Sequence, residues 1–381
     1  MRLCLVTPGF SAAEDDWCIP ALHTLVRRLT PDHDVTVVAL RHPPRRHGYD
    51  FHRARVVPLA AGTRTGTGRV AMLVRALAVI RREHRRASFD AVHGLWADEA
   101  GFVATVAGRR WGIRSVVSVM GGELVGLADI GYGTQLGRTG RWLVHHSLST
   151  ADVVTIGSRL LADPVRAVRG DRPVERAPLG VDTTMFRPDG ERAAIDGEPC
   201  LLQVASLGPV KNPQLLLDAF ARLSSRHPGA HLHVVGDGPL RGSLREQASA
   251  LRLGERVHLH GHMAHDRLPA IYRRADLHVV CSRYESQCMA ALEAAACGTP
   301  TIGTAVGVLP ELERAGAAVT TGSDEPDDLV AALTDLIEDR GHRHTLGSAA
   351  AALVPSDFDV ERCTRRFEEI CAGRAASRGV R

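Results

Sequence analysis

Residues Leu201–Phe220 read LLQVASLGPVKNPQLLLDAF, an apolar strand that gives way to a Gly-Pro turn and then to a helix. The turn carries Lys211, the only lysine in a chain with 47 basic residues. Arginine offers a flat fork for two contacts, whereas lysine offers a compact charge on a flexible stem. A compact cation at a strand–turn–helix predicts a phosphate-binding site. The alternative is a chance lysine in an arginine-rich chain.

Length and composition set the broad class of the protein. At 381 residues, with 44% hydrophobic and 24% charged residues, the chain is expected to form two globular domains. It has no run of about 18 apolar residues that would span a membrane, and its start, MRLCLVTPGF, lacks the pattern of a signal peptide. The eight cysteines form no C-x-x-C pair, so we expect reduced thiols in a cytoplasmic protein.

Strand and helix patterns alternate along both halves of the chain, which predicts parallel sheets flanked by helices. A stretch punctuated by prolines and charges, Arg187–Pro199, separates the halves. We therefore predict an α/β fold with two Rossmann-like, doubly wound domains over residues 1–190 and 191–356. A C-terminal helix and tail over residues 357–381 is expected to cross back to the first domain. Ligands of such folds bind at the carboxyl ends of the strands, here in the cleft between the domains.

Individual elements follow from the same patterns. Val70–Arg86 is expected to be helical because apolar residues recur at helical spacing with arginines on the other face. The last helix, Asp357–Cys371, has Ser356 or Asp357 as its expected N-cap and Phe358 on its buried side. The expected strands are Arg2–Thr7, Val35–Ala39, Ala91–His93, Ser115–Met120, Val153–Ile156, Leu201–Ala205, His231–Val235, Val257–Leu259, Leu277–Cys281 and Thr301–Thr304.

A second candidate site lies in CSRYESQCMAALEAAACGTP (Cys281–Pro300). A strand ends at Cys281, a loop carries Glu285, and an alanine-rich helix carries Glu293. Eight residues of helix span about 12 Å, roughly the distance from the ribose to the sugar of a nucleotide-sugar. Ionised carboxylates accept hydrogen bonds from hydroxyls, and the helix N-terminus between them would face a diphosphate. The alternative is one capping and one surface glutamate.

Positive charge is concentrated in the segment Arg41–Arg86, which holds twelve arginines against Asp50 and Glu83. Such a segment favours contact with an acidic acceptor or an anionic membrane surface. The alternative is a solvated, arginine-rich face. Nucleic acid is not an expected partner, because aromatic residues for base stacking make up only 4% of the chain.

Together these motifs resemble the retaining glycosyltransferases of family 4, which have the GT-B fold. Glu285 and Glu293 fit the paired glutamates of that family, and Ala296–Pro300 fits the segment that follows them. PLGVDTTMFRP (Pro178–Pro188) fits its signature before the linker. Four further motifs fall in the family's order, namely VVGDGP (Val234–Pro239), VHLHG (Val257–Gly261), YRRADLHVVCS (Tyr272–Ser282) and VGVLPE (Val306–Glu311). The resemblance covers nearly the whole chain.

The resemblance implies roles for residues of this chain. Lys211 would bind the donor diphosphate, Glu293 the ribose hydroxyls and Glu285 the transferred sugar. The backbone around Gly261 would hold the base, and the loop around Gly9 would approach the diphosphate. Glu285 and Lys211 are the expected catalytic residues. The expected donor-binding residues are Glu293, Ser286, Gln287, Cys288, Met289, Ser206, Gly9, Gly238, Gly261, His262, Met263 and Arg283.

Three positions depart from the family pattern. The arginine usually found five residues before the lysine is Ser206 here, which should weaken diphosphate binding unless another cation such as Arg283 substitutes. Ser286–Cys288 replaces Gly-Phe-Gly and could reshape the sugar pocket. The strand that usually ends in a sugar-contacting histidine ends in Met120, so a neighbouring glutamate would have to take over. The expected acceptor-side residues are Glu123, Gly122, Asp129, Tyr132 and His93.

The resulting hypothesis is a metal-independent glycosyltransferase that transfers a sugar, from a UDP-sugar by preference, to an acceptor hydroxyl with retention. No cofactor beyond the nucleotide-sugar is implied, because a lysine and a helix N-terminus can stabilise the departing diphosphate. The acceptor stays open, with acidic and lipid-linked acceptors included, as does contact of Arg41–Arg86 with the inner face of the membrane. The alternatives are an epimerase or hydrolase of nucleotide-sugars and a catalytically inactive protein that binds them.

Overall fold

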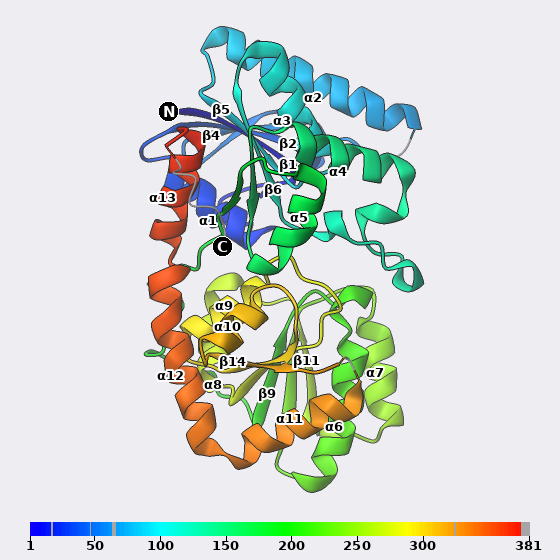
Figure 1. Cartoon of the computed structure of the whole chain (residues 1–381). Helices are drawn as coiled ribbons and strands as arrows, with labels where there is room; N and C mark the ends of the chain where they lie inside the picture. The colour runs from blue at the N-terminus through cyan, green and yellow to red at the C-terminus, as the bar shows by residue number, and fades with distance from the viewer. Residues whose placement is uncertain (17, 46, 63–65, 324, 375–381) are drawn as a thin grey trace. The chain divides into compact units, whose positions relative to one another are not determined.

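The computed structural model describes residues 1–16, 18–45, 47–62, 66–323 and 325–374. This part of the chain divides into two compact units: residues 1–180 with residues 360–374 (unit 1), and Val181–Asp359 (unit 2). Each unit is built on a predominantly parallel sheet with helices packed on it (Figure 1). The predicted α/β class is therefore confirmed.

The predicted boundary at 190/191 lies inside unit 2. The backbone N–H of Val181 donates to the carbonyl oxygen of Phe358 at 2.8 Å. The side chains of Val181 and Phe186 are buried in the core of unit 2. Residues 181–190 therefore fold with unit 2, because their apolar side chains complete its core.

The described residues of unit 1 form an eight-stranded sheet in the order β3-β4-β2-β1-β5-β6-β7-β8, parallel except for the β3–β4 pair. Its strands are β1 (Arg2–Gly9), β2 (Asp34–His42), β3 (Tyr49–Phe51), β4 (Ala54–Pro58), β5 (Ala91–Leu95), β6 (Arg114–Val119), β7 (Val153–Ile156) and β8 (Val174–Arg176). Successive residues of a strand face opposite sides, so Leu3 and Leu5 pack in one core layer and Cys4 and Val6 in the other.

Helices cover both faces of this sheet (Figure 1). Residues of α1 and α13 pack in the layer that contains Leu5, and residues of α2 and α3 pack in the layer that contains Val6. The α-helices of unit 1 are α1 (Pro20–Leu29), α2 (Gly66–Arg86), α3 (Glu99–Trp111), α4 (Arg138–Thr150), α5 (Ala162–Arg169) and α13 (Val360–Cys371). Short 3-10 helices follow β6 and β7, namely η1 (Gly122–Leu124), η2 (Ala128–Ile130), η3 (Thr134–Leu136) and η4 (Arg159–Leu161).

The C-terminal helix α13 packs on unit 1, as the sequence predicted. The ring of Phe367 stacks on that of His93 with centroids 4.5 Å apart. The guanidinium of Arg366 pairs with the carboxylate of Glu175 in β8 at 2.7 Å. An apolar face and a charged edge thus both attach this helix to the sheet.

The predicted start of that last helix is wrong. Ser356 and Asp357 are the final residues of α12 (Arg340–Asp357), and α13 begins at Val360. Phe358 lies between the two helices and is buried in the core of unit 2. An N-cap at Ser356 or Asp357 was expected because short polar residues precede an amphipathic run, but here they end the preceding helix.

The described residues of unit 2 form a six-stranded parallel sheet in the order β11-β10-β9-β12-β13-β14. Its strands are β9 (Cys200–Val204), β10 (His231–Val235), β11 (Val257–Gly261), β12 (Leu277–Val280), β13 (Thr301–Thr304) and β14 (Ala318–Thr321). Its helices are α6 (Pro213–Arg226), α7 (Arg241–Ala250), α8 (Leu268–Arg274), α9 (Met289–Ala296), α10 (Leu309–Arg314), α11 (Pro326–Glu338) and α12, with the short helices η5 (Pro209–Lys211), η6 (Gly254–Arg256) and η7 (His265–Arg267). The strand order reverses between β9 and β12, where open α/β sheets bind their ligands.

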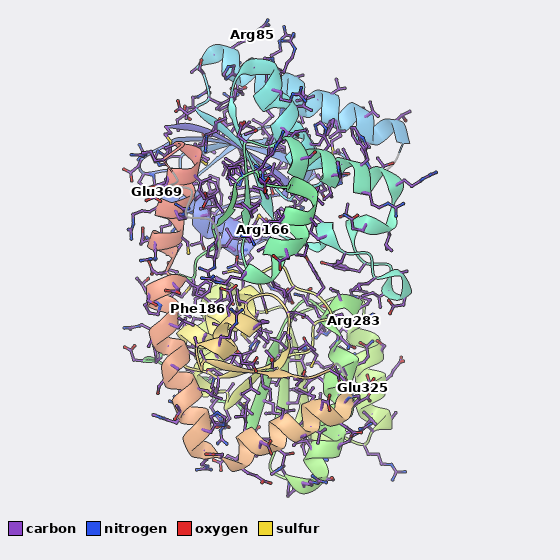
Figure 2. All side chains as sticks on the ribbon, in the orientation of Figure 1. Arg85, Arg166, Phe186, Arg283, Glu325 and Glu369 are labelled. Carbon is purple, nitrogen blue, oxygen red and sulfur yellow. The ribbon has the colours of Figure 1, made fainter. Side chains whose placement is uncertain are left out.

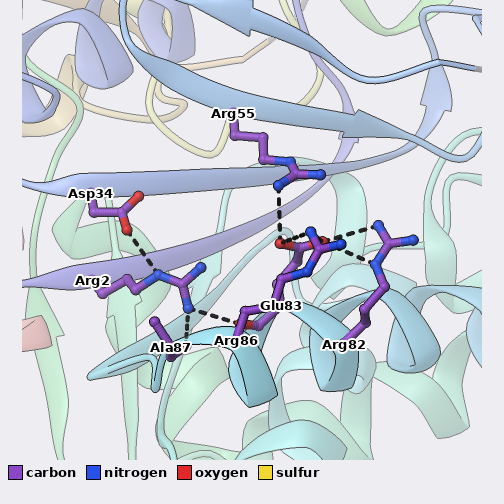
Figure 3. Close-up of polar contacts among 7 residues, drawn as sticks. All are labelled: Arg2, Asp34, Arg55, Arg82, Glu83, Arg86 and Ala87. Carbon is purple, nitrogen blue, oxygen red and sulfur yellow. Dashed lines mark hydrogen bonds and ion pairs between the residues drawn. The ribbon is translucent and has the colours of Figure 1, made fainter.

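Part of the basic segment Arg41–Arg86 is neutralised within unit 1. The carboxylate of Glu83 in α2 is 1% exposed and forms ion pairs with Arg55, Arg82 and Arg86 (Figure 3). Burial acts to raise the pKa of Glu83, but the arginines around it outweigh burial and lower this pKa below its ordinary value. The charge of these three arginines is therefore partly balanced by a buried carboxylate.

A second buried carboxylate does the same for two more arginines of the segment. Glu99 in α3 pairs with Arg41 at 3.1 Å and with Arg69 at 3.2 Å. At least five of the twelve arginines in the segment Arg41–Arg86 therefore form ion pairs within unit 1. Among the residues that the structure describes, none of the helices has the length and apolar character needed to cross a membrane.

Candidate functional site

Lys211 lies at the carboxyl edge of the unit 2 sheet, next to the reversal of strand order. The turn after β9 forms η5, which begins with a proline, and Asn212 then adopts a left-handed conformation with φ of 47° before Pro213 starts α6. Two prolines with fixed φ give this turn little conformational freedom. The Nζ of Lys211 lies 2.5 Å from Oε1 of Glu285, in the loop that follows β12.

Further hydrogen bonds join the two loops. The hydroxyl of Ser282 donates to the same Oε1 of Glu285 at 2.7 Å. The backbone N–H of Arg283 (Figure 2) donates to the carbonyl oxygen of Val210 at 2.8 Å. Since the side chains of Lys211 and Glu285 are 23% and 12% exposed, the ion pair is sheltered but still reachable from solvent. The structure thus brings the two expected catalytic residues together and places the backbone of Arg283 beside the lysine turn.

The residues that stand in place of Gly-Phe-Gly lead directly into α9. Ser286 and Gln287 are buried, and Cys288 has a left-handed φ of 73°, which costs a residue with a side chain about 1–2 kcal/mol. The N–H of Val308 donates to the carbonyl oxygen of Gln287 at 2.9 Å. A Cβ on Gly307 would lie 2.5 Å from that oxygen. Glycine at 307 therefore lets the loop before α10 support this strained turn, and Met289 begins α9 directly after it.

Glu293 is buried in α9 and contacts two side chains that sequence reasoning missed. Its Oε1 lies 2.9 Å from Nε2 of His265 in η7, and its Oε2 accepts a hydrogen bond from the hydroxyl of Tyr272 in α8 at 3.2 Å. The ring of Phe186 packs against that of His265 with centroids 5.1 Å apart. Burial and then the charge of Glu293 raise the pKa of Tyr272 well above its ordinary value, so the phenol stays a donor. An ionised carboxylate has further lone pairs to offer a ligand hydroxyl.

Replacing Glu293 with alanine is expected to lower the free energy of unfolding by about 1–3 kcal/mol, because it removes the acceptor used by the buried Tyr272 hydroxyl. Glu293→Gln keeps an acceptor oxygen and should lose less. Urea unfolding followed by circular dichroism compares the three proteins. An alanine variant as stable as the wild type would contradict the hydrogen bonds assigned to this carboxylate.

The loop that contains Ser206 packs on the loop after β10. The N–H of Leu207 donates to the carbonyl oxygen of Asp237 at 2.9 Å. A Cβ on Gly238 would lie 2.6 Å from the carbonyl oxygen of Leu207, so this close approach requires glycine. Ser206 itself is exposed. Gly238 therefore holds the loop of Ser206 in place through backbone packing.

The loop after β11 carries the residues expected to hold a base. Gly261 has a φ of 73°, and the guanidinium of Arg241 comes within 3.1 Å of the position its Cβ would occupy. His262 is exposed, and Met263 packs against the core of unit 2. Arg241 also pairs with Asp237 at 3.0 Å. A cation that the sequence did not single out thus lies beside the loops after β10 and β11.

Glu123, expected on the acceptor side, positions backbone instead. It is 1% exposed, and its Oε1 accepts from the N–H groups of Ala97 and Met120, each at 3.0 Å. Its Oε2 accepts from the N–H of Gly121 at 2.6 Å. Burial raises the pKa of Glu123 against the effect of these amides. Because the carboxylate is enclosed and bound by three amides, we reassign it from ligand contact to holding the loops after β5 and β6.

His93 is also a packed residue rather than a ligand contact. It is buried, its Nε2 lies 2.7 Å from Oγ of Ser118, and its ring stacks on Phe367. Burial lowers the pKa of His93 to about 3, so the ring is neutral at pH 7. The sequence did not predict this burial, because α13, which covers the histidine, comes from a distant part of the chain.

The other residues expected on the acceptor side lie in the loop after β6. The backbones of Leu127 and Tyr132 bond to each other, N–H to carbonyl, at 2.8 and 3.1 Å. A Cβ on Gly122 would lie 2.8 Å from the ring of Tyr132, and Asp129 is exposed. The structure thus brings Gly122 and Tyr132 together. Gly9, which was expected on the donor side, is the last residue of β1 and is buried.

A partly buried acidic residue that sequence reasoning missed precedes α3. The carboxylate of Asp98 accepts from the N–H of Ala100 at 3.4 Å as the N-cap of this helix. Burial, followed by the charges of Glu99 and Glu123, raises the pKa of Asp98 to about 7. The folded protein therefore keeps a proton on Asp98 to near-neutral pH, whereas an unfolded chain releases it at about pH 3.9.

Asp98→Asn is expected to gain stability relative to the wild type as the pH rises. The stabilisation that comes from protonated Asp98 is complete below about pH 4 and is lost as the pH approaches 7, the folded-state pKa. Asparagine keeps the capping oxygen and cannot ionise. Melting curves at pH 5, 6, 7 and 8 should show a difference in Tm that grows with pH in favour of the variant. A constant difference would show that Asp98 has an ordinary pKa.

Two family models match most of this chain. Residues 189–353 match the model for Glycosyl transferases group 1, and residues 19–180 match the Glycosyl transferase 4-like domain. The chain is a family 4 glycosyltransferase with the GT-B fold. The two matched regions of this glycosyltransferase fall in unit 2 and unit 1 respectively. The predicted family and the prediction of an enzyme are therefore confirmed.

Curated relatives of this glycosyltransferase act on different molecules. The GDP-mannose-dependent alpha-(1-6)-phosphatidylinositol monomannoside mannosyltransferase of Mycolicibacterium smegmatis is 28% identical over 94% of this chain and 95% of its own length. The D-inositol 3-phosphate glycosyltransferase of Acidothermus cellulolyticus is 33% identical over 72% of this chain and 66% of its own length. The enzyme of that name from Nocardia farcinica is 33% identical, and the match spans about half (51%) of that protein.

Solved structures agree on the fold of this glycosyltransferase. Sucrose-phosphate synthase from Thermosynechococcus elongatus superposes with a TM-score of 0.82 at 20% identity, over 97% of this chain and 98% of that chain. HepE from Anabaena, in complex with UDP and glucose, superposes with a TM-score of 0.75 at 17% identity, over 98% of this chain and 100% of that chain. At these identities the likeness concerns the fold alone.

Proposed function

We propose that this glycosyltransferase moves a sugar from a nucleoside diphosphate sugar to an acceptor hydroxyl, with retention of configuration and without a metal. The observation that carries the proposal is the pairing of Lys211 with Glu285 at the reversal of strand order in unit 2, with Glu293 on the helix that follows. The cation suits the diphosphate of such a donor, and the two carboxylates suit the hydroxyls of its sugar and its ribose. Ligands of open α/β sheets bind at this edge.

Positive charge for the leaving diphosphate would come from the protein itself. Negative charge grows on the diphosphate as its bond to the sugar breaks, and pre-placed donors aimed at that charge speed the reaction. Lys211 can exchange the Glu285 carboxylate for a phosphate oxygen. The N–H groups in the first turn of α9 add the positive end of a helix dipole. These groups support transfer without a metal, although Ser206 supplies no charge.

Glu285 would act on the sugar rather than on the phosphate. As the bond to the diphosphate lengthens, the anomeric carbon gains positive charge, which a nearby carboxylate stabilises. The acceptor hydroxyl attacks from the face that the diphosphate leaves, which gives retention. This role requires Lys211 to leave the Glu285 carboxylate when the donor binds.

The acceptor in this proposal carries negative charge. The names of the relatives from Mycolicibacterium and Acidothermus both contain a phosphorylated inositol, and the segment Arg41–Arg86 of unit 1 holds twelve arginines against two acidic residues. Arginine suits phosphate because its fork matches two oxygens. The same segment would dock on an anionic membrane if the acceptor is lipid-linked.

Thermal melting with UDP, GDP, ADP and TDP is the first test. A diphosphate at about 100 times its dissociation constant adds about 2.7 kcal/mol of stability, so the correct base should give a clear rise in Tm. We expect UDP or GDP to give it, because HepE was solved with UDP and a relative depends on GDP-mannose. The matching nucleotide-sugar is then incubated with inositol phosphate or with lipid-linked acceptors, with and without EDTA.

The outcomes separate the proposal from its alternatives. Transfer that needs the acceptor and survives EDTA supports it. Conversion of the donor without any acceptor would favour an epimerase or hydrolase, and binding without turnover would favour an inactive protein. Loss of transfer with EDTA, restored by a divalent cation, would contradict the metal-independent mechanism.

A further inference from the structure

Four histidines lie on one face of β10 and β11. His231 and His233 alternate on β10, and His258 and His260 alternate on β11. Residues two apart in a strand face the same side, and the parallel pairing places His233 opposite His258. The rings of these two stack with centroids 4.4 Å apart. We call the four residues the histidine ladder.

Hydrogen bonds fix the direction of the nitrogen lone pairs in the ladder. Nδ1 of His231 lies 2.9 Å from Nε2 of His258, and Nδ1 of His233 lies 2.9 Å from Nε2 of His260. Nε2 of His233 lies 2.9 Å from the carbonyl oxygen of Asp196. Because a carbonyl only accepts, neutral His233 donates through Nε2 and presents the lone pair of Nδ1 toward the other rings. Metal-ligating histidines are held in the same way, with the second ring nitrogen bonded to a carbonyl or carboxylate.

Negative charge lies beside the ladder. The carboxylates of Asp196 and Glu255 both interact electrostatically with His258, so they lie close enough to balance the charge of a bound ion.

We propose that His231, His233 and His258 bind one divalent metal ion of the class that prefers imidazole, namely Zn²⁺, Ni²⁺ or Cu²⁺. One ring nitrogen from each of the three lies within 4.8 Å of the other two. Metal–nitrogen bonds of about 2.0–2.1 Å place tetrahedral ligands about 3.4 Å apart, so binding requires the ring nitrogens to move closer together by rotation of the side chains. Binding breaks two ring-to-ring hydrogen bonds. The ring of His231 or His258 that carries the proton between them moves it to its other nitrogen through solvent, and the Nε2–H of His260 gives up the Nδ1 of His233 to the ion. Mg²⁺ and Ca²⁺ prefer oxygen ligands and do not fit.

The ion would act on unit 2 as a structural cross-link. β11 is the edge strand of the sheet, and an edge strand has neighbours on one side only. A metal shared by two β10 residues and one β11 residue ties that edge to the sheet. The ion takes no part in the proposed sugar transfer, in which Lys211 stabilises the leaving diphosphate.

Isothermal titration of tag-free, EDTA-treated protein with Zn²⁺ tests the site. We expect one equivalent to bind with a dissociation constant of micromolar or tighter and to raise Tm, and we expect Mg²⁺ to do neither. His231→Gln and His258→Gln should each weaken Zn²⁺ binding by at least tenfold. The matched control is His344→Gln, an exposed histidine on α12 of the same unit, which should leave binding unchanged.

A spectroscopic readout on the wild type keeps the test decisive even if a variant folds poorly. Bound Cu²⁺ should show coupling to several imidazole nitrogens in its electron paramagnetic resonance spectrum. Absence of stoichiometric Zn²⁺ binding, Zn²⁺ binding that persists in both glutamine variants, or a Cu²⁺ spectrum with a single nitrogen ligand would each overturn the proposal.

Discussion

Lys211→Ala is expected to lower kcat for sugar transfer by about 10²–10³-fold, the usual loss when one group that stabilises developing charge is removed. The variant should also lose the rise in Tm caused by the nucleoside diphosphate. Its own stability should change by less than about 1 kcal/mol, because a partly exposed ion pair contributes little to folding. Steady-state release of nucleoside diphosphate and thermal melting measure both effects.

Two further variants test whether position and charge matter at this turn. Lys211→Arg keeps the charge but replaces a compact ammonium with a wide fork, so it should recover only part of the activity. Ser206→Arg restores the cation that the family pattern has five residues earlier and should tighten diphosphate binding. Near-normal kcat in Lys211→Ala would remove this lysine from the mechanism.

Glu285→Ala is expected to lower kcat by about 100-fold or more. Its effect on diphosphate binding should differ from that of Lys211→Ala. Glu285 holds Lys211 at 2.5 Å in the ligand-free protein. Its removal releases the lysine, so diphosphate binding should be unchanged or tighter while turnover falls. Parallel measurement of kcat and of the Kd for the diphosphate separates this pattern from that of Lys211→Ala, in which both are impaired.

The glutamine variant is the matched control for charge. Glu285→Gln keeps the shape of the side chain and its contact with Ser282, so a loss as large as that of alanine assigns the effect to negative charge. Recovery of most activity in glutamine would assign it to hydrogen bonding. Turnover close to the wild type in Glu285→Ala would end the assignment of this residue to the reaction.

The central strands of both sheets were predictable from the sequence, and so was the edge strand β11, but the strands at the other edges were not. Buried parallel strands are short, nearly continuous apolar runs, and β1, β5, β9 and β12 all show that pattern. The prediction omitted β3, β4, β8 and β14, which lie at or beside the ends of their sheets. Strands there are partly exposed and carry polar residues, as in Tyr49–Phe51 and Val174–Arg176, so the apolar signal is weak.

Within the candidate site, position along the chain predicted some neighbours and failed for others. Lys211 and Glu285 are 74 residues apart, yet both follow strands that flank the reversal of order, and sheet topology brings such loops together. The contacts of Glu293 with His265 and Tyr272 depend on how α8 packs on α9. No local spacing encodes that packing, and a lone histidine in a polar loop gives no signal.

The discontinuity of unit 1 has a consequence for synthesis on the ribosome. Residues 1–180 emerge before unit 2, but α13, which covers His93 and supplies Phe367 to the core, is made only after unit 2. Unit 2 is continuous from Val181 to Asp359 and has all of its strands before α13 appears. The nascent chain must therefore carry an uncovered apolar surface on its first sheet until α13 has been synthesised, which is the period in which chaperones bind such surfaces.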